Sequence, residues 1–153
     1  MSRLADHLTL LLLTLWVGAM WAVGYLVTPT LFSMLADRTL AGAVAGRLFT
    51  FVAWIGLGVS AYLLLFLSVR MGWQAFRSGV FWLVLVLLVC TAVGHFGIQP
   101  LMAELKALAW PREVMDSVTR DRFATWHGVS SVLYLIQSML GVLLVLSVRR
   151  VLR

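Results

Sequence analysis

Four long stretches of the chain contain no Asp, Glu, Lys or Arg, and all eighteen of these charged residues lie outside them. The stretches cover residues 7–36, 48–69, 78–103 and 123–148. Each is at least as long as the roughly 20 apolar residues that a helix needs to cross a hydrocarbon core of about 30 Å. The pattern predicts four membrane-spanning helices, at about residues 7–36, 48–69, 79–109 and 123–147.

These helices account for most of the chain, so we expect residues 1–153 to form a single transmembrane domain. The predicted fold class is all-α, an integral membrane four-helix bundle. Pro29 and Pro100 fall inside the first and third helices. Because a proline bends a membrane helix without ending it, both helices are expected to continue past their prolines.

The two halves of the chain also resemble each other in the same direction. Residues 22–25 read Ala-Val-Gly-Tyr and residues 92–95 read Ala-Val-Gly-His, and a proline follows in both halves with an offset of one residue. This match favours a tandem repeat of two helical hairpins, in which Tyr25 and His95 would be equivalent. Chance similarity between apolar helices is the alternative.

Composition excludes a separate soluble domain and gives no support to nucleic-acid binding. Hydrophobic residues make up 62% of the chain and charged residues 12%, with a mean hydropathy of +0.99. The net charge is +6, but the basic residues are spread over the termini and connections and do not follow one face. Basic excess in a membrane protein reflects topology and anionic headgroups. We therefore expect the protein to be embedded in the lipid bilayer and to bind no nucleic acid.

An even number of crossings places both termini on one side of the membrane. Each side would carry six basic residues, so the count of bases does not set the orientation. Asp6 is the one acidic residue on the terminal side, against five on the other. The C-terminal arginines Arg149, Arg150 and Arg153 therefore favour cytoplasmic termini, and we expect a bacterial inner-membrane protein.

The fourth helix carries a stripe of small and polar residues. At 100° per residue they fall within an arc of about 120°, and the opposite face is apolar. The stripe comprises His127, Ser130, Ser131, Tyr134, Gln137, Ser138 and Gly141. This pattern indicates that one side of the helix faces protein or a wet cavity and that the other faces lipid.

Other helices are expected to contribute to the same polar intramembrane cluster. His95 and Gln99 lie near the end of the third helix, at a depth similar to that of His127, and Tyr25 lies near the end of the first. Two interpretations stay open: interhelical packing with ordinary hydrogen bonds, and a polar pocket.

The first helix has a second seam, with heptad-like spacing that is typical of a packed interface. It comprises His7, Thr14, Gly18, Trp21, Tyr25 and Thr28.

The histidines raise the question of a cofactor. His95 and His127 on neighbouring helices could ligate haem axially or bind copper, because neutral imidazole is a ligand for both. Two nitrogens make an incomplete zinc site, and the chain contains no CxxC, HExxH or CxxCH motif. No carboxylate occurs at bilayer depth to form a proton relay. We therefore predict no catalytic residue and no cofactor, with a haem or copper site at these histidines as the alternative.

Several short motifs carry a resemblance to a known family. They lie at residues 7–18 (His7, then Trp-Val-Gly at 16–18), 29–32 (Pro29 and Phe32), 47–49 (Arg-Leu-Phe), 99–102 (Gln-Pro-Leu-Met) and 123–131 (Phe-Ala-Thr-Trp-His-Gly-Val-Ser-Ser). With these motifs the chain resembles the family of transmembrane protein 205, also described as domain of unknown function 4149.

The resemblance implies a four-helix membrane protein whose bacterial members have no settled biochemical role. Relatives tend to have asparagine near the position of His95, which weakens the two-histidine ligand hypothesis. The family pattern implies instead a hydrogen-bonding role for His127, tying the fourth helix to the third or the first.

These observations lead to a non-enzymatic integral membrane protein, acting as an accessory, assembly or partner-binding factor. Its partner would be another membrane protein or a further copy of the chain. A haem- or copper-binding membrane protein and a small transporter or channel subunit are the alternatives.

Overall fold

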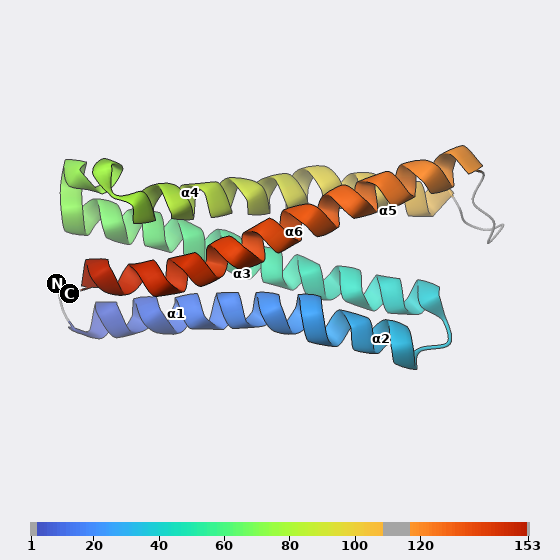
Figure 1. Cartoon of the computed structure of the whole chain (residues 1–153), viewed down its shortest axis with the longest axis horizontal. Coiled ribbons are helices and arrows are strands. Elements are labelled where there is room, and N and C mark those ends of the chain that lie inside the picture. Colours follow the sequence, from blue (N-terminus) through green and yellow to red (C-terminus); the bar gives the residue numbers. More distant parts are fainter. Residues whose placement is uncertain (1–2, 109–116, 153) are drawn as a thin grey trace.

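The computed structural model describes residues 3–108 and 117–152 of the chain. These residues form helices and turns without a strand (Figure 1). Four helical rods are long and apolar enough to cross a membrane: Arg3–Met34, Arg38–Arg77, Gly79–Ala107 and Val118–Val148. The predicted all-α bundle with four helices of membrane type is confirmed.

The first and third rods are each built from an α-helix, a π-helical turn and a second α-helix. The first rod comprises α1 (Arg3–Trp21), η1 (Ala22–Val27) and α2 (Thr28–Met34). The third comprises α4 (Gly79–Ala92), η3 (Val93–Ile98) and α5 (Gln99–Leu108). The prediction that these helices continue past their prolines is therefore correct as far as the described residues extend.

Each π-helical turn has a proline as its cause. A proline ring clashes with the carbonyl four residues before it and has no N–H to donate. Widening the turn relieves that clash. The N–H of Thr28, just before Pro29, binds the carbonyl of Val23, and the N–H of Gln99, just before Pro100, binds that of Gly94.

The two π-helical turns set the register between the halves of the chain. They begin at residues 22 and 93, which are 71 positions apart, and the prolines at 29 and 100 have the same spacing. In this register Tyr25 corresponds to Phe96. The expectation that Tyr25 and His95 are equivalent is therefore wrong by one residue, because the prolines and not the Ala-Val-Gly motifs fix the helical geometry.

The second and fourth rods are longer than the charge-free stretches that predicted them. They comprise α3 (Arg38–Met71) followed by the 3₁₀-helix η2 (Gly72–Arg77), and α6 (Ser117–Leu152). Asp37 caps α3, since its carboxylate accepts from the backbone N–H groups of Thr39 at 2.8 Å and Leu40 at 3.1 Å. Charges mark the point where a helix leaves the hydrocarbon, whereas caps and turns decide where it ends.

The rods form a four-sided bundle. α1 packs against α3 and α6, and α4 packs against the same two helices. The start of α1, the end of α6 and η2 lie at one end of the bundle, called the terminal end, and the opposite end is the far end (Figure 1).

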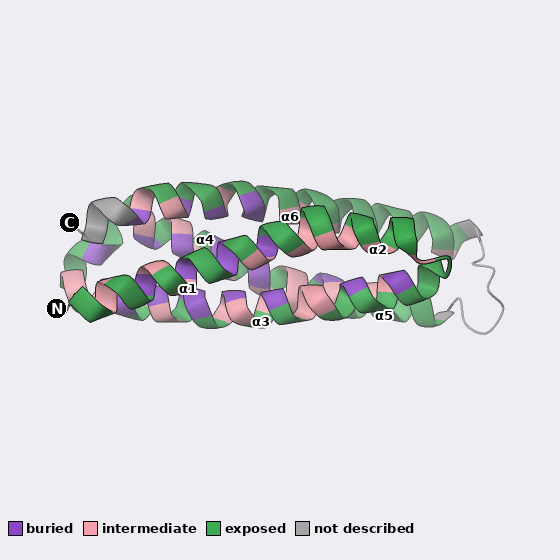
Figure 2. Ribbon diagram, turned by 90° about the horizontal axis from the view of Figure 1, so that it is seen from below, coloured by how far each residue is buried: buried purple, intermediate pink, exposed green. Residues whose placement is uncertain are grey.

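The main apolar core occupies the terminal half, and a few further residues, Ala41, Ala45, Ile98 and Leu105, are buried toward the far end. The members of the main core come from α1, α3, η2, α4 and α6, and they include Leu13, Trp16, Leu63, Leu87 and Leu144, each no more than 1% exposed. In contrast, η1 and α2 contain no buried residue. α2 packs on α3 and α5 packs on α6, but the close packing of α1 on α6 does not continue between α2 and α6. The bundle therefore packs most closely in its terminal half, and toward the far end α2 with α3 diverges from α5 with α6 (Figure 1). Figure 2 shows how buried and exposed residues alternate along the rods.

The outer surface is as apolar as the core. Leu11, Leu65 and Leu146 are each at least 65% exposed, and exposed residues cover the outward faces of all the rods (Figure 2). Exposed apolar side chains over a whole bundle are unfavourable in water and favourable in a hydrocarbon layer. The surface therefore agrees with four membrane-type helices.

Close packing depends on particular glycines. The Trp16 side chain, 1% exposed, lies directly over Gly56 of α3. A methyl group on Gly56 would stand 2.5 Å from the Trp16 Nε1 atom. Gly58, two residues further along the same helix, has nothing within 4 Å of that position. Gly56 is therefore required for the contact between α1 and α3, and Gly58 is not.

Gly56→Ala should lower the free energy of unfolding by about 1–3 kcal/mol, because the buried indole ring cannot move away from the added methyl group. Gly58→Ala is the matched control and should leave stability unchanged or slightly raised, since alanine favours the helix. Thermal unfolding in detergent, followed by circular dichroism, measures both. Equal melting temperatures for the two variants would contradict the packing of Trp16 on Gly56.

Candidate functional site

The structure divides the polar stripe of α6 into buried and exposed parts. Gln137, Ser138 and Gly141 are buried, Ser130 and Tyr134 are half-buried, and His127 and Ser131 are exposed. The division follows the bundle, because α1 and α4 cover α6 only in the terminal half. The prediction of an inward-facing stripe is correct for the C-terminal part and wrong for His127 and Ser131.

Tyr134 joins three helices at the centre of the bundle. Its hydroxyl donates to the backbone carbonyl of Met20, at 2.7 Å, just before η1 begins. Its ring meets Phe49 of α3 edge to face, with centroids 5.0 Å apart. A methyl group on Gly24 would overlap the tyrosine ring, so only glycine at that position lets the hydroxyl approach α1 so closely.

Gln137 makes the second link, from α6 to α4. Its Nε2 donates to the Thr91 hydroxyl oxygen at 3.2 Å, and the Thr91 hydroxyl donates to the carbonyl of Leu87 at 2.8 Å. Both side chains are 7% exposed. The bond therefore satisfies a buried Gln137 amide group that would otherwise have no partner in the core.

Trp21 adds a third link, between α1 and α6. Its Nε1–H donates to the backbone carbonyl of Ser138 at 3.4 Å, and the Ser138 hydroxyl donates to the carbonyl of Tyr134 at 2.8 Å. The Tyr25 ring packs between Trp21 and Tyr134, with centroid distances of 5.1 Å and 6.3 Å. Tyr134, Gln137 and the Ser138 carbonyl thus make hydrogen bonds to other helices, whereas the Ser138 hydroxyl bonds within α6.

His95 and Gln99 form a separate group on the other side of the bundle. The His95 Nδ1 atom lies 2.9 Å from the Gln99 Oε1 atom, to which the Thr50 hydroxyl also donates at 3.4 Å. The imidazole ring meets Trp54 of α3 nearly at right angles, with centroids 5.1 Å apart. His95 therefore ties η3 to α3 and not to α6.

Within residues 3–108 and 117–152, the His127 side chain makes no hydrogen bond to another helix, in contrast to what the family resemblance implied. Its ring stacks on Phe123 of its own helix, at 6.0 Å and 5° between planes. The Lys106 ammonium group lies over the same Phe123 ring at 6.0 Å. Tyr134 and Gln137 make the links that were expected of His127, because they lie in the half of α6 that neighbouring helices cover.

The sequence-predicted site residues therefore do not meet in one pocket. Tyr25, Tyr134 and Gln137 lie at the centre, His95 and Gln99 lie against α3, and His127 lies toward the far end with Ser130 and Ser131. No described interaction joins His95 to His127. Across residues 3–108 and 117–152, no cluster of three or more His, Cys, Asp or Glu side chains could hold a metal ion.

Residues that the sequence did not single out complete the polar contacts. Asp6 forms an ion pair with Arg70, and the Thr9 hydroxyl lies 3.1 Å from that of Tyr62, so two polar pairs join α1 to α3 at the terminal end. The hydroxyl of Ser60 is buried without a hydrogen-bond partner among the described residues. The sequence gives no signal for these pairs, because each joins positions on different helices.

The packed face of α1 also differs from the prediction. Thr14, Gly18 and Tyr25 of the heptad-like seam are exposed, and Trp21 is 39% exposed. The core is made instead by Leu13, Trp16, Val17 and Met20 of the same helix. Small and polar residues are typical of a helix interface. In this bundle, however, the larger apolar side chains on the adjacent face of α1 fill the core, and the seam is left at the surface.

Comparison with protein-family models gives a match over more than half of the chain. A family model described as Domain of unknown function (DUF4149) matches residues 11–111. The match covers most of α1 and continues to the end of α5, and it excludes α6 with its His-Gly-x-Ser motif at residues 127–130. No curated protein and no solved structure matches the chain significantly.

Tyr134→Phe should lower the free energy of unfolding by about 0.5–1.5 kcal/mol, since it removes the hydroxyl bound to the Met20 carbonyl and keeps the ring. Tyr25→Phe is the matched control, because no described hydrogen bond uses its hydroxyl. Denaturation of the detergent-solubilised protein measures both. A larger loss for Tyr25→Phe would contradict the central role of Tyr134.

Proposed function

Because the chain belongs to the family of the domain of unknown function DUF4149, we propose its function from the site alone. It is a non-enzymatic integral membrane protein that binds another membrane protein, as an accessory or assembly factor. The binding surface is the far-half polar face, which we define as Tyr25, Ser131 and His127.

The pairing of the interior polar groups supports a non-enzymatic role. Tyr134, Gln137 and Trp21 direct their polar atoms at other helices, at distances of 2.7, 3.2 and 3.4 Å. Buried groups that bind one another hold helices in place and are not presented to a substrate.

The observation that carries the proposal is the exposure of polar side chains where α2 and α6 separate. Tyr25 is 42% exposed and lies beside Tyr134. Ser131 and His127 follow on the same face of α6, three and seven residues before Tyr134. The Ser131 hydroxyl donates to the His127 carbonyl of its own helix at 2.8 Å and can still accept a hydrogen bond. Inside a bilayer no solvent serves the His127 ring or the Tyr25 hydroxyl, so a partner helix that binds them is favoured over lipid.

The partner would contact this surface below the headgroups of the far side. His127 lies five residues after Arg122, the last charged residue before the charge-free stretch. At 1.5 Å per residue this is about 7.5 Å deeper along α6. A partner with a membrane helix bearing hydrogen-bonding side chains at that depth fits the surface.

A photo-crosslinking amino acid at position 131, in native membranes, should give one discrete adduct with another membrane protein. The same group in place of Val129 should give none, because Val129 lies at similar depth on the opposite side of α6 and is 45% exposed. His127→Ala should reduce the adduct formed from position 131.

Three results would contradict the proposal. Equal adducts from positions 129 and 131 would indicate random contact, and an adduct of two copies of this chain would indicate a homo-oligomer. A haem absorption band or bound copper in the pure protein would favour the alternative site at His95 and His127. The transporter or channel alternative stays a prediction that requires solute flux above that of empty vesicles.

We also propose a bacterial inner membrane with both termini in the cytoplasm. The start of α1 and the end of α6 share the terminal end (Figure 1), where the sequence has six basic residues and one acidic residue, against six basic and five acidic residues on the other side. Basic residues are favoured on the cytoplasmic side. The narrower likeness to transmembrane protein 205 stays a prediction from the short motifs.

A further inference from the structure

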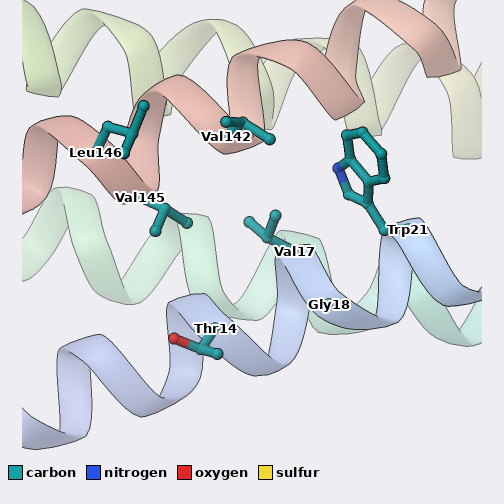
Figure 3. A pocket seen from close by; sticks show the side chains of 7 residues that line it. All are labelled: Thr14, Val17, Gly18, Trp21, Val142, Val145 and Leu146. Atoms are coloured by element: carbon teal, nitrogen blue, oxygen red, sulfur yellow. The ribbon is translucent and has the colours of Figure 1, made fainter.

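A groove runs between α1 and α6 in the terminal half of the bundle (Figure 3). Its volume is about 420 Å³, and it is a shallow, open hollow on the surface of the bundle rather than an enclosed cavity. Thr14, Gly18 and Trp21 line it from α1, and Val142 and Leu146 line it from α6. It adjoins the far-half polar face at Trp21, whose ring lies 5.1 Å from that of Tyr25, but none of its lining residues belongs to that face.

The groove exists because the α1 seam is built from small residues. Gly18 is exposed, and a methyl group there would have nothing within 4 Å. The neighbouring Val17 side chain packs against Gly141, which keeps the two helices close beneath the groove. A hollow thus remains above a tight helix contact.

The position of the groove restricts what can fill it. Its residues all lie inside the charge-free stretches 7–36 and 123–148, at hydrocarbon depth. From Thr14 to Trp21 it extends for about 10 Å along the helix axis, the direction in which acyl chains run. An apolar chain parallel to the helices fits this shape.

The charges at the terminal end of the groove favour an anionic headgroup. The same stripe of α1 continues back to His7 and Arg3, and Arg149 and Arg150 follow Leu146 on α6 by three and four positions. Asp6 is the one acidic residue described at this end, and Arg70 of α3 already binds it. Basic residues at headgroup depth attract anionic lipids.

We propose that an anionic phospholipid binds here, with one acyl chain in the groove and its phosphate at the level of positions 149 and 150. The groove supplies the apolar contact, and the arginines supply selectivity for charge. Neither a zwitterionic lipid nor a free phosphate ion satisfies both parts.

Native mass spectrometry of the detergent-purified full chain, with phosphatidylglycerol or phosphatidylcholine added, tests the proposal. The wild-type protein should retain phosphatidylglycerol with a roughly tenfold preference. Gly18→Leu should remove that retention by filling the groove. Gly58→Leu is the matched control on α3, also exposed and without neighbours, and should retain the lipid as wild type does.

Further variants separate the two parts of the site. Replacing Arg149 and Arg150 together by glutamine should abolish the preference for phosphatidylglycerol while weak binding of both lipids persists. Thr14→Leu fills the groove from a second position and replaces Gly18→Leu if that variant does not fold, as judged by circular dichroism. Inorganic phosphate should not compete.

Three results would overturn the proposal. Equal retention of both lipids by the wild-type protein would show that charge has no role. Unchanged retention in the folded groove-filling variants would show that the lipid binds elsewhere. A wild-type dimer that Gly18→Leu dissociates would show that a second copy of the chain occupies the groove.

Discussion

Inside a hydrocarbon layer no water is present to bind polar groups, so a polar side chain of one helix is held strongly by a backbone carbonyl of another. Pro29 widens the first rod at η1, and donors gather around that turn. The Thr28 hydroxyl binds the Val23 carbonyl at 2.7 Å, and the Tyr134 hydroxyl binds the Met20 carbonyl at the same distance. The bond from α6 lies where the closed half of the bundle ends, and the packing on either side of it depends on this contact.

Two different surfaces follow from this arrangement. Toward the terminal end, α1 and α6 stay close and leave between them the shallow apolar groove above Val17 and Gly141. Toward the far end α2 and α6 no longer pack closely, and polar side chains of the same α6 stripe become exposed. One stripe therefore provides internal bonds in one half of the helix and a lipid-facing polar surface in the other. The first surface fits a lipid, and the second fits a partner helix.

The sequence predicted the rods because charge placement along a membrane helix is governed by a single constraint, the thickness of the hydrocarbon. It placed the first residue of α3 too late, because the cap at Asp37 is a local feature outside the charge-free stretch. It also predicted the direction of the α6 stripe, since helical periodicity is a property of one segment. How much of that stripe is covered depends on how the rods pack against one another, which no single segment encodes.

The pairs themselves were beyond the reach of sequence patterns. Tyr134 with Met20 and Gln137 with Thr91 join residues that are far apart in the chain, and both pairs depend on helix rotation. His127 stands out in the sequence because it is a histidine in a short motif. Its residue type, however, does not indicate whether another helix packs over it. The seam of α1 has the spacing of an interface, but larger side chains on the adjacent face form the core in its place.

The collision rate of nitroxide spin labels with oxygen, measured along α6 in lipid bilayers, tests the division of the stripe most directly. Labels are placed one at a time at positions 131, 135, 137, 138 and 144 of a protein in which Cys90 is replaced by alanine. We predict high oxygen accessibility at 131 and 135, which are exposed, and low accessibility at 137, 138 and 144, which are buried. Equal accessibility at all five positions, or protection at 131 in the isolated protein, would contradict a bundle that is closed in one half and open in the other.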